Sequence, residues 1–198
     1  MRVILLVLAV VLLLAGFGGC SSYNRLVALD ESVSSAWAQV GNVYQRRADL
    51  IPNLVETVKG AADFEKSTLT QVVEARAKAT QIQMEVSSEV LNNPQAFERF
   101  QAAQGELSGA LARLLVAVER YPELKANENF LALQSQLEGT ENRIAVERRN
   151  FNETAQTYNA QIRRIPARFI AAIAGFEKRP YFQAEPGAEK APAVKFVD

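Results

Sequence analysis

Histidine is absent from this sequence, and cysteine occurs once, at position 20. The absence of histidine removes the commonest general base, the usual ligand of first-row metals and every nucleophile that depends on a Ser–His or Cys–His pair. It also excludes a ferritin-type di-iron site, which requires Glu-x-x-His pairs. A single cysteine allows neither an intramolecular disulfide nor a thiolate metal cluster. We therefore expect no metal and no cofactor.

An excess of charge of either sign is also lacking, because Lys plus Arg and Asp plus Glu number 22 each. Without a general basic field there is little to release counterions from a nucleic-acid backbone, so nucleic acid is not an expected partner. The apolar share of 48% and the charged share of 22% are typical of globular proteins. A chain of 198 residues fits one domain plus a targeting segment.

The longest apolar run lies at the amino terminus, from Val3 to Phe17, directly after Arg2. A spanning helix needs about 17 to 25 apolar residues, and this run is at or below the lower edge of that range. A charged start, an apolar stretch and a boundary of small residues are typical of a signal peptide. The run therefore fits a signal peptide better than a full membrane span.

Residues 17–20 (FGGC) resemble a bacterial lipobox, in which the cysteine is diacylated and becomes the new amino terminus after cleavage. We predict that residues 1–20 are a signal peptide or membrane anchor and that Cys20 is the lipidation site. The alternative is an uncleaved transmembrane helix that runs straight into the next helix. In both cases Arg2 stays cytoplasmic, and the rest of the chain lies on the periplasmic or extracellular side.

After Cys20 the apolar residues recur at helical spacing and strand signals are almost absent. The pattern predicts an all-α fold, an elongated antiparallel four-helix bundle with coiled-coil-like packing that follows the amino-terminal apolar segment. We expect the bundle, with a short carboxy-terminal helix, to span residues 21–182. Residues 183–198 are expected to form a loosely ordered tail.

The first two predicted helices meet near Pro52. The first is expected to stop near Arg47, because Asp49 is a good cap and proline is tolerated in the first turn of a new helix. The second then runs from about Leu50 to about Val90. A single kinked helix through Pro52 is the alternative. The buried positions expected in the second helix are Leu54, Val58, Ala62, Leu69, Val72 and Ile82.

The third helix is bounded by Pro94 and Pro122, and only Gln104 interrupts its apolar stripe. In the first helix Asp30 is the corresponding polar interruption. The fourth helix repeats a large apolar residue at every seventh position, which favours left-handed, coiled-coil-like packing. The repeating residues are Phe130, Leu137, Ile144, Phe151, Tyr158 and Ile165, and the polar half of the seam holds Thr140, Glu147, Thr154 and Gln161.

A short amphipathic helix is expected after Pro166, over Ala167 to Ala174, with Gly175 as its stop. Its large apolar residues are expected to pack against the end of the bundle. These residues are Phe169, Ile170, Ile173 and Phe176.

Several strings of residues after Cys20 are distinctive in their exact sequence as well as in the spacing of their apolar residues. They are YN at 23–24 with LV at 26–27, AWAQV at 36–40, RRADLIPNLVETV at 46–58, YPELKANENF at 121–130, LEGTENRIAVERR at 137–149, YN at 158–159 and GF at 175–176. In order and spacing they resemble the LemA family of bacterial envelope proteins. The resemblance implies an antiparallel helical bundle tethered by an amino-terminal hydrophobic segment, with no assigned biochemical activity. The chain departs from the common pattern at Gly41 and in its short apolar segment that ends in cysteine.

Three groups of residues offer candidate sites. The carboxylates Glu138, Glu141 and Glu147 could act as paired acids in glycan hydrolysis, although exposed helix charges paired with Arg143 and Arg148 are the commoner explanation.

Arg46, Arg47 and Asp49 could form a docking point or close a helix junction. Arg163, Arg164 and Arg168 could contact lipid or an anionic polymer, or lie at a solvated helix end. Trp37, Tyr44 and the seven-step aromatics are assigned to the core. No residue is assigned a catalytic role.

The sequence favours a membrane-tethered, non-enzymatic scaffold or adaptor that binds another envelope protein and contacts lipid through its amino terminus. The alternative is a cell-wall polymer binder or hydrolase with Glu138 or Glu141 as the acid. A third hypothesis is self-association of bundles through the polar seam of the fourth helix.

Overall fold

The structure is a computed structural model, and it describes residues 2–60, 64–86 and 90–183. Within these ranges all regular secondary structure is helical, as the sequence predicts. The helices are α1 (Arg2–Lys59), α2 (Lys66–Val86), α3 (Pro94–Val118), α4 (Pro122–Lys125), α5 (Glu128–Gln161) and α6 (Ala167–Ala174). The predicted loosely ordered tail, apart from residue 183, lies outside the described residues.

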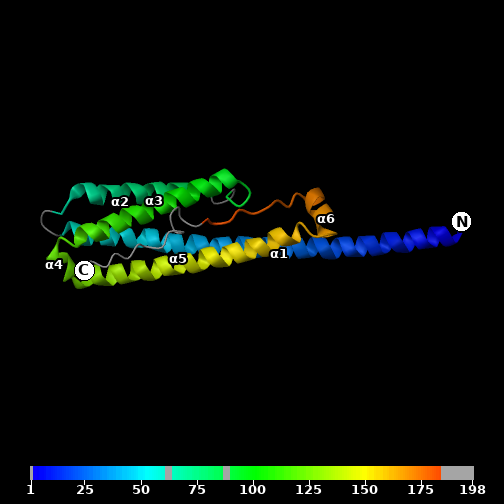
Figure 1. Ribbon diagram of the computed structural model, residues 1–198, viewed down its shortest axis with the longest axis horizontal. Helices are drawn as coiled ribbons and strands as arrows, with labels where there is room; N and C mark the ends of the chain where they lie inside the picture. Colours follow the sequence, from blue (N-terminus) through cyan, green and yellow to red (C-terminus); the bar gives the residue numbers. More distant parts are fainter. Residues whose placement is uncertain (1, 61–63, 87–89, 184–198) are drawn as a thin grey trace, which may run out of the picture.

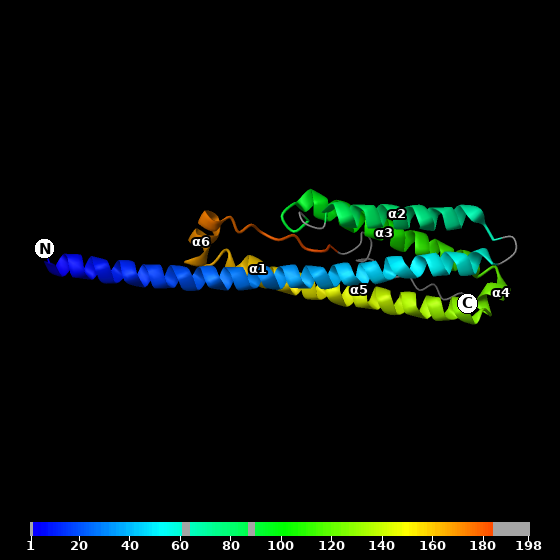
Figure 2. The same cartoon turned by 180° about the vertical axis from the view of Figure 1, so that it is seen from behind.

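The long helices lie side by side and form a rod (Figure 1). α1 packs most extensively on α5, α2 packs on α3, and α1 also contacts α2. The view from behind shows the same order, with α4 at the far end of the rod from the amino terminus (Figure 2). We call the end near α4 the distal end and the end near α6 the proximal end. Within the described residues, no helix is found that combines the length and apolar character needed to cross a membrane.

The predicted break between the first two helices is wrong, because α1 continues through Pro52 to Lys59. Proline lacks the N–H that would bond the carbonyl of Ala48, four residues earlier. Arg76 of α2 supplies the missing donor, since its Nε donates to the Ala48 carbonyl oxygen over 2.8 Å. The neighbouring helix therefore satisfies the carbonyl that Pro52 leaves free, and the helix does not need to stop.

The predicted second helix from Leu50 to Val90 is consequently divided between two elements. Leu54 and Val58 are buried residues of α1, whereas Leu69 and Val72 are buried residues of α2. Ile82 of α2 is only partly buried, and Ala62 lies outside the described residues.

The third and fourth predicted helices are confirmed as α3 and α5. Asn93 caps α3, because its side-chain oxygen accepts hydrogen bonds from the backbone N–H groups of Gln95 and Ala96. Asn127 caps α5 in the same way through the N–H of Phe130. Between them Pro122 begins the one-turn helix α4. Local capping residues thus set the starts of both helices.

The short helix α6 is confirmed in its bounds, and Gly175 ends it in the left-handed region at φ 76°. Its predicted packing is partly wrong. Ala167 and Ala171 are the buried residues, and they contact Leu26 of α1 with Ile170 and Phe176 alongside. Phe169 and Ile173 instead remain 62% and 89% exposed. Small residues face α1 because they allow close approach of the two helices.

Two main hydrophobic cores follow one another along the rod. The distal core is mostly aliphatic and includes Leu54, Val72, Leu107 and Leu114. The proximal core is aromatic, and Trp37 lies at its centre with ring centroids 5.1 to 6.1 Å away on four phenylalanines. These four are Phe97, Phe100, Phe151 and Phe182. The prediction that Trp37, Tyr44 and the seven-step aromatics form core is confirmed, since Tyr44, Phe130, Phe151 and Tyr158 are buried and Trp37 is half-buried. Ile165, the last residue of the seven-step repeat, instead lies beyond the end of α5 and is 77% exposed.

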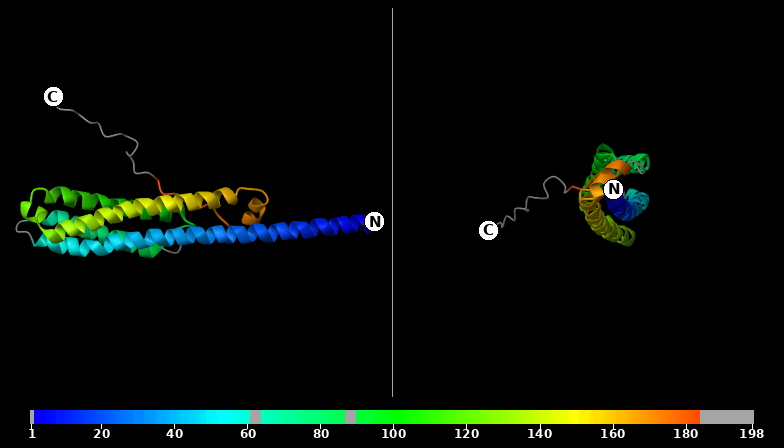
Figure 3. Two further views of the ribbon diagram at one scale, coloured as in Figure 1. Left: turned by 90° about the horizontal axis from the view of Figure 1, so that it is seen from below. Right: turned by 90° about the vertical axis from the view of Figure 1, so that its right-hand side faces the viewer.

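An extended segment after α6, residues 176–183, runs back along the rod (Figure 3, left). We call it the strap. Asn159 of α5 holds it, because its amide donates to the Arg179 carbonyl and accepts from the Arg179 N–H. Asn152 holds it in the same two-way manner at Phe182, whose ring enters the aromatic core. The strap is therefore part of the packed structure.

Candidate functional site

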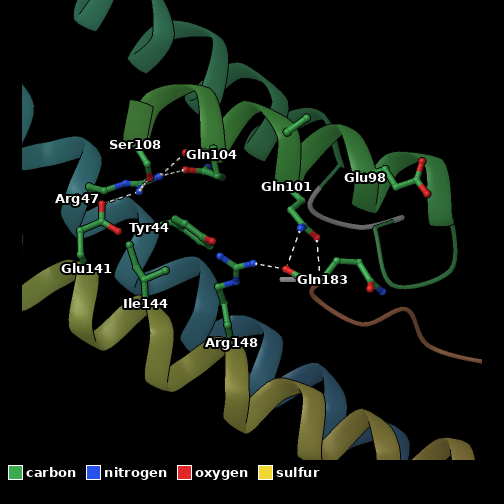
Figure 4. Close-up of a pocket in the computed structure, with 12 residues that line it drawn as sticks. Tyr44, Arg47, Glu98, Gln101, Gln104, Ser108, Glu141, Ile144, Arg148 and Gln183 are labelled. Carbon is green, nitrogen blue, oxygen red and sulfur yellow. Dashed lines mark hydrogen bonds and ion pairs between the residues drawn. The ribbon is translucent and has the colours of Figure 1, made fainter. Parts of the chain in front are cut away.

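A buried polar layer crosses the rod where the two cores meet. Its centre is Arg47 of α1, whose neighbours Tyr44 and Ile51 belong to the aromatic and the distal core, respectively. Only 1% of Arg47 is exposed. α3 and α5 complete the layer with Gln104, Ser108 and Glu141 (Figure 4). Three helices thus meet at one charged side chain.

The Arg47 guanidinium makes four hydrogen bonds in this layer. Its Nη1 donates to Ser108 Oγ and to Glu141 Oε1, each over 2.7 Å. Its Nη2 donates to both oxygens of Gln104, over 3.2 Å to the carbonyl and 2.5 Å to the side chain. The Nε has no hydrogen-bond partner among the described residues. Gln104, which interrupts the predicted stripe of α3, is therefore an arginine ligand.

Electrostatics explain why this arginine can be buried. A guanidinium stays charged in proteins, so burial demands a counter-charge and hydrogen-bond acceptors. Glu141 supplies the counter-charge while its side chain stays 43% exposed. The Tyr44 ring lies 5.1 Å from Arg47 Cζ and adds a cation–π contact. Because Glu141 keeps contact with water, the pair links the buried layer to the surface.

A groove of about 440 Å³ opens above the layer, between α1, α3, α5 and the strap. Glu98 and Gln101 of α3 line one wall, and Ile144 and Arg148 of α5 line the other (Figure 4). Gln183 of the strap closes one end. The groove therefore presents charges of both signs beside amide groups.

The strap fixes the shape of this groove through Gln183. The Gln183 carbonyl accepts hydrogen bonds from Gln101 Nε2 over 3.2 Å and from Arg148 Nη2 over 2.9 Å. The Gln183 N–H donates to Gln101 Oε1 over 3.3 Å. The Arg148 guanidinium also lies 4.8 Å above the Phe182 ring. Helices and strap are joined at the rim, so the groove is formed before any ligand arrives.

The groove is lined by charged and hydrogen-bonding groups. Its donors are guanidinium and amide groups, its acceptors are carboxylates and amide oxygens, and the Ser108 hydroxyl accepts a hydrogen bond from Arg47. In the part of the chain that the structure describes, no three acidic or cysteine side chains are grouped to hold a metal.

The predicted carboxylates do not share one site. Glu141 faces Arg47, whereas Glu138 accepts a hydrogen bond from Gln134 of the same helix over 3.0 Å. Glu147 accepts from Asn150 over 3.2 Å. Arg148, expected as a partner of these acids, donates to Gln183 instead. Only Glu141 therefore contributes to the groove.

The predicted docking point at Arg46, Arg47 and Asp49 is also divided. Arg47 points into the layer, Arg46 is exposed, and Asp49 accepts from Gln45 over 2.8 Å. The expectation that Arg47 closes a helix junction through Asp49 is wrong, because the helix has no junction there. The basic residues Arg163, Arg164 and Arg168 are exposed beside α6, and Cys20 is exposed on α1.

A second buried arginine, Arg179 of the strap, was not predicted. It is 8% exposed and forms an ion pair with Asp30 of α1. Its Nη1 donates to the Leu91 carbonyl over 3.3 Å and to the Asn92 side chain. Asp30, the polar interruption of the first predicted stripe, was the only sequence signal for this contact.

Tyr158 lies beneath the Arg179 guanidinium, with its ring centroid 5.4 Å from Cζ. Its hydroxyl is buried and has no hydrogen-bond partner among the described residues. Burial raises the pKa of the Tyr158 phenol above its ordinary value, and the positive charge of Arg179 opposes that rise in part. The neutral phenol is therefore the form that the fold favours.

The amino-acid sequence of this chain is similar to those of several known proteins. The chain is 26% identical over 181 residues to magnetosome protein MamQ 2 of Paramagnetospirillum magneticum, and equally similar to magnetosome protein MamQ of Magnetospirillum gryphiswaldense. These alignments cover 84% of this chain and 66% of each relative, so the chain spans just under two thirds of their length. Protein LemA of Metamycoplasma hominis is 22% identical over 70% of this chain and 58% of its own length. The profile of the LemA family matches residues 36–196, and the chain therefore belongs to the LemA family.

Proposed function

We propose that this protein is a membrane-tethered, non-enzymatic scaffold of the bacterial envelope, built as an antiparallel four-helix bundle on an amino-terminal anchor. The observation that carries the proposal is the unbroken course of α1 from Arg2 to Lys59. The apolar run Val3 to Phe17 and one wall of both cores belong to the same helix. Whatever holds the amino terminus therefore holds the whole rod.

The relatives support a structural role. Two of them are named as magnetosome proteins, and their alignments cover most of the helical chain. A part in a cellular structure agrees with a groove whose side chains suit the binding of a partner rather than catalysis. Lipidation at Cys20 and export of the rod remain part of the proposal, because the sequence pattern at residues 17–20 is their support.

The groove above Arg47 is the proposed contact for a partner protein. Its rim combines Glu98, Arg148 and the amide of Gln183, which suits a polar or charged peptide segment. The strap and helices hold these groups before binding, so little order has to be gained on association. The partner contact is therefore expected on this side of the rod.

Site-specific photocrosslinking in intact cells tests this proposal. A photoreactive residue at Ala102, which is exposed and lines the groove, is expected to trap a discrete protein. The matched control is Val116, which lies on the same helix and is 71% exposed. Equal adducts from both positions, or none from Ala102, would contradict a partner in the groove.

The tether is tested separately by the intact mass of the full-length protein from its native membrane, compared with Cys20→Ala. A mature chain that begins at acylated Cys20 establishes the lipoprotein. An intact Met1 without lipid makes residues 3–19 an uncleaved anchor. Recovery in the soluble fraction, with neither lipid nor anchor, contradicts tethering.

A further inference from the structure

α6 carries an apolar stripe that no described residue covers. Ile165, just before the helix, is 77% exposed, Phe169 is 62% exposed and Ile173 is 89% exposed. Phe169 and Ile173 are four residues apart, so they lie on one side of the helix. The opposite side, with Ala167 and Ala171, packs on α1. α6 is therefore amphipathic with its larger apolar face outward.

Basic groups flank this stripe. Arg163, Arg164 and Arg168 are exposed, and Glu177 just beyond Gly175 is the nearest acidic residue along the chain. A hollow of about 450 Å³ lies beside α6, lined by Arg163 and Arg168 together with Ile162, Ala171, Ala172 and Phe176. Arg163 Nε donates to the Asn159 carbonyl over 3.3 Å, which anchors that side chain. Two guanidinium groups beside apolar surface suit a phosphate that is attached to an apolar chain.

The position of α6 indicates which surface covers it. It packs on Leu26, which lies six positions after Cys20, about 9 Å along a helix. Tyr23 lies between them, with its ring centroid 5.9 Å from that of Phe176. α6 lies across the rod rather than along it, and α1 alone of the described helices extends past it (Figure 3, left). A bilayer that holds the amino-terminal run would meet α6 nearly flat.

We propose that α6 is an interfacial helix that binds the surface of an anionic bilayer. Phe169 and Ile173 enter the boundary between head groups and acyl chains, while Arg163 and Arg168 hold lipid phosphate. The inference rests on the proposed membrane tether. It adds a second contact, which fixes the tilt and rotation of the rod at the membrane. Acylation at Cys20 and an uncleaved anchor both leave α6 at this height.

Quenching by brominated lipids tests the contact in the full-length protein, reconstituted in vesicles of phosphatidylcholine and phosphatidylglycerol. The reporter is Phe169→Trp, and the matched control is Val116→Trp, an exposed position on α3 toward the distal end. The native Trp37 is a constant background, because it lies 17 residues, about 26 Å of helix, beyond Cys20. We expect loss of most of the added emission for F169W and none for V116W. Equal quenching of the two reporters would overturn the inference.

The proposed contact of the two arginines with lipid phosphate is tested by the double substitution Arg163→Ala and Arg168→Ala in the F169W protein. We expect this pair to weaken the quenching in anionic vesicles, whereas the exposed pair Arg99→Ala and Arg113→Ala on α3 leaves it unchanged. Quenching that is the same in all three proteins would overturn the proposed role of the arginines.

Flotation separates this inference from the tether. Protein that floats with carbonate-washed vesicles while F169W is not quenched overturns only the α6 contact. Protein that does not float overturns the tether itself. A blue-shifted F169W emission without lipid quenching, lost on dilution to one chain per vesicle, would assign the apolar face to a second copy and overturn the lipid assignment.

Discussion

Arg47 and Arg179 are both buried, 1% and 8% exposed, and each pairs with one carboxylate, Glu141 for the first and Asp30 for the second. A tyrosine ring lies near each guanidinium, at 5.1 and 5.4 Å. In each case the Nε has no hydrogen-bond partner among the described residues. The buried charges of the two arginines are therefore stabilised by the same kinds of group.

They differ in what they connect. The ligands of Arg47 come from regular helices, α3 and α5, and lie between two cores. The strap carries Arg179, whose ligands are Asp30 of α1 and the turn at residues 91–92. Loss of the first should affect the packing of three helices, whereas loss of the second should release one segment. Burial of a charge therefore does not by itself determine how much of the fold depends on it.

The largest effect is expected for Arg47→Ala. This change leaves the Gln104 side chain and Ser108 without their charged donor in a buried layer, and it breaks the pair with Glu141. Removal of one member of a buried ion pair costs about 3 to 5 kcal/mol, and the exposure of Glu141 favours the lower end. Urea unfolding of the detergent-solubilised protein measures the loss. Arg46→Ala, one residue earlier and exposed, is the control and should change stability by less than about 0.5 kcal/mol. Equal losses would mean that the layer contributes nothing.

A smaller and local effect is expected for Arg179→Ala, about 2 kcal/mol, because hydrogen bonds to charged groups contribute about 1.5 to 3 kcal/mol. Hydrogen exchange should speed up in the strap, residues 176–183, and in the turn at residues 91–92. Exchange in the distal core should stay unchanged. Faster exchange along all of α3 and α5 would show that Arg179, like Arg47, supports the whole rod.

A third arginine, Arg76, donates to the backbone carbonyl of Ala48 and forms no ion pair among the described residues. Arg76→Ala should cost about 1 kcal/mol, the typical value of one hydrogen bond. In a Pro52→Ala background the new N–H bonds the Ala48 carbonyl, so the same change should cost much less. A double-mutant cycle on unfolding free energies measures this coupling. Additive costs would refute the compensation of Pro52 by Arg76.

The smallest effect is expected for Tyr158→Phe. No hydrogen bond among the described residues is lost, so stability at pH 7 should change by less than about 0.5 kcal/mol. Because folding raises the pKa of Tyr158, its contribution is present below the ordinary tyrosine pKa of about 10 and is lost as pH rises through the folded value. Urea unfolding at pH 7 and above pH 10 should therefore show a weaker alkaline loss in Y158F. Tyr23→Phe, at a 45% exposed position, should keep the alkaline loss of the wild type.

Local chemistry made part of the fold predictable. Pro94 at the start of α3 and Gly175 at the end of α6 were predicted, and each acts on its own turn. The prediction at Pro52 failed because its rescue comes from Arg76, 24 residues away on another helix. A rule about one helix cannot include a donor from its neighbour.

The sequence named Arg47 and Glu141 as candidates but not as a pair, and it marked two further arginine ligands only as exceptions to a pattern. Asp30 and Gln104 interrupt apolar stripes, and both turn out to be arginine ligands, with partners 149 and 57 residues away. The sequence marks such positions but not their partners, because pairing depends on how the helices pack. The prediction of which face of α6 is buried failed for a related reason, since alanines rather than Phe169 and Ile173 make the close contact.

Because α1 is continuous, it sets both the distance of the groove from Cys20 and the direction in which the groove faces around the rod axis. Arg47 lies 27 residues beyond Cys20, so on the proposed tether the groove stands about 40 Å above the point where the chain would leave the lipid. Each residue also turns a helix by about 100°. Insertion of one residue between Cys20 and Leu26 would hardly change that height, yet it would rotate the groove by more than a quarter turn relative to anything fixed in the membrane. A partner in the same membrane would then face the wrong side of the rod.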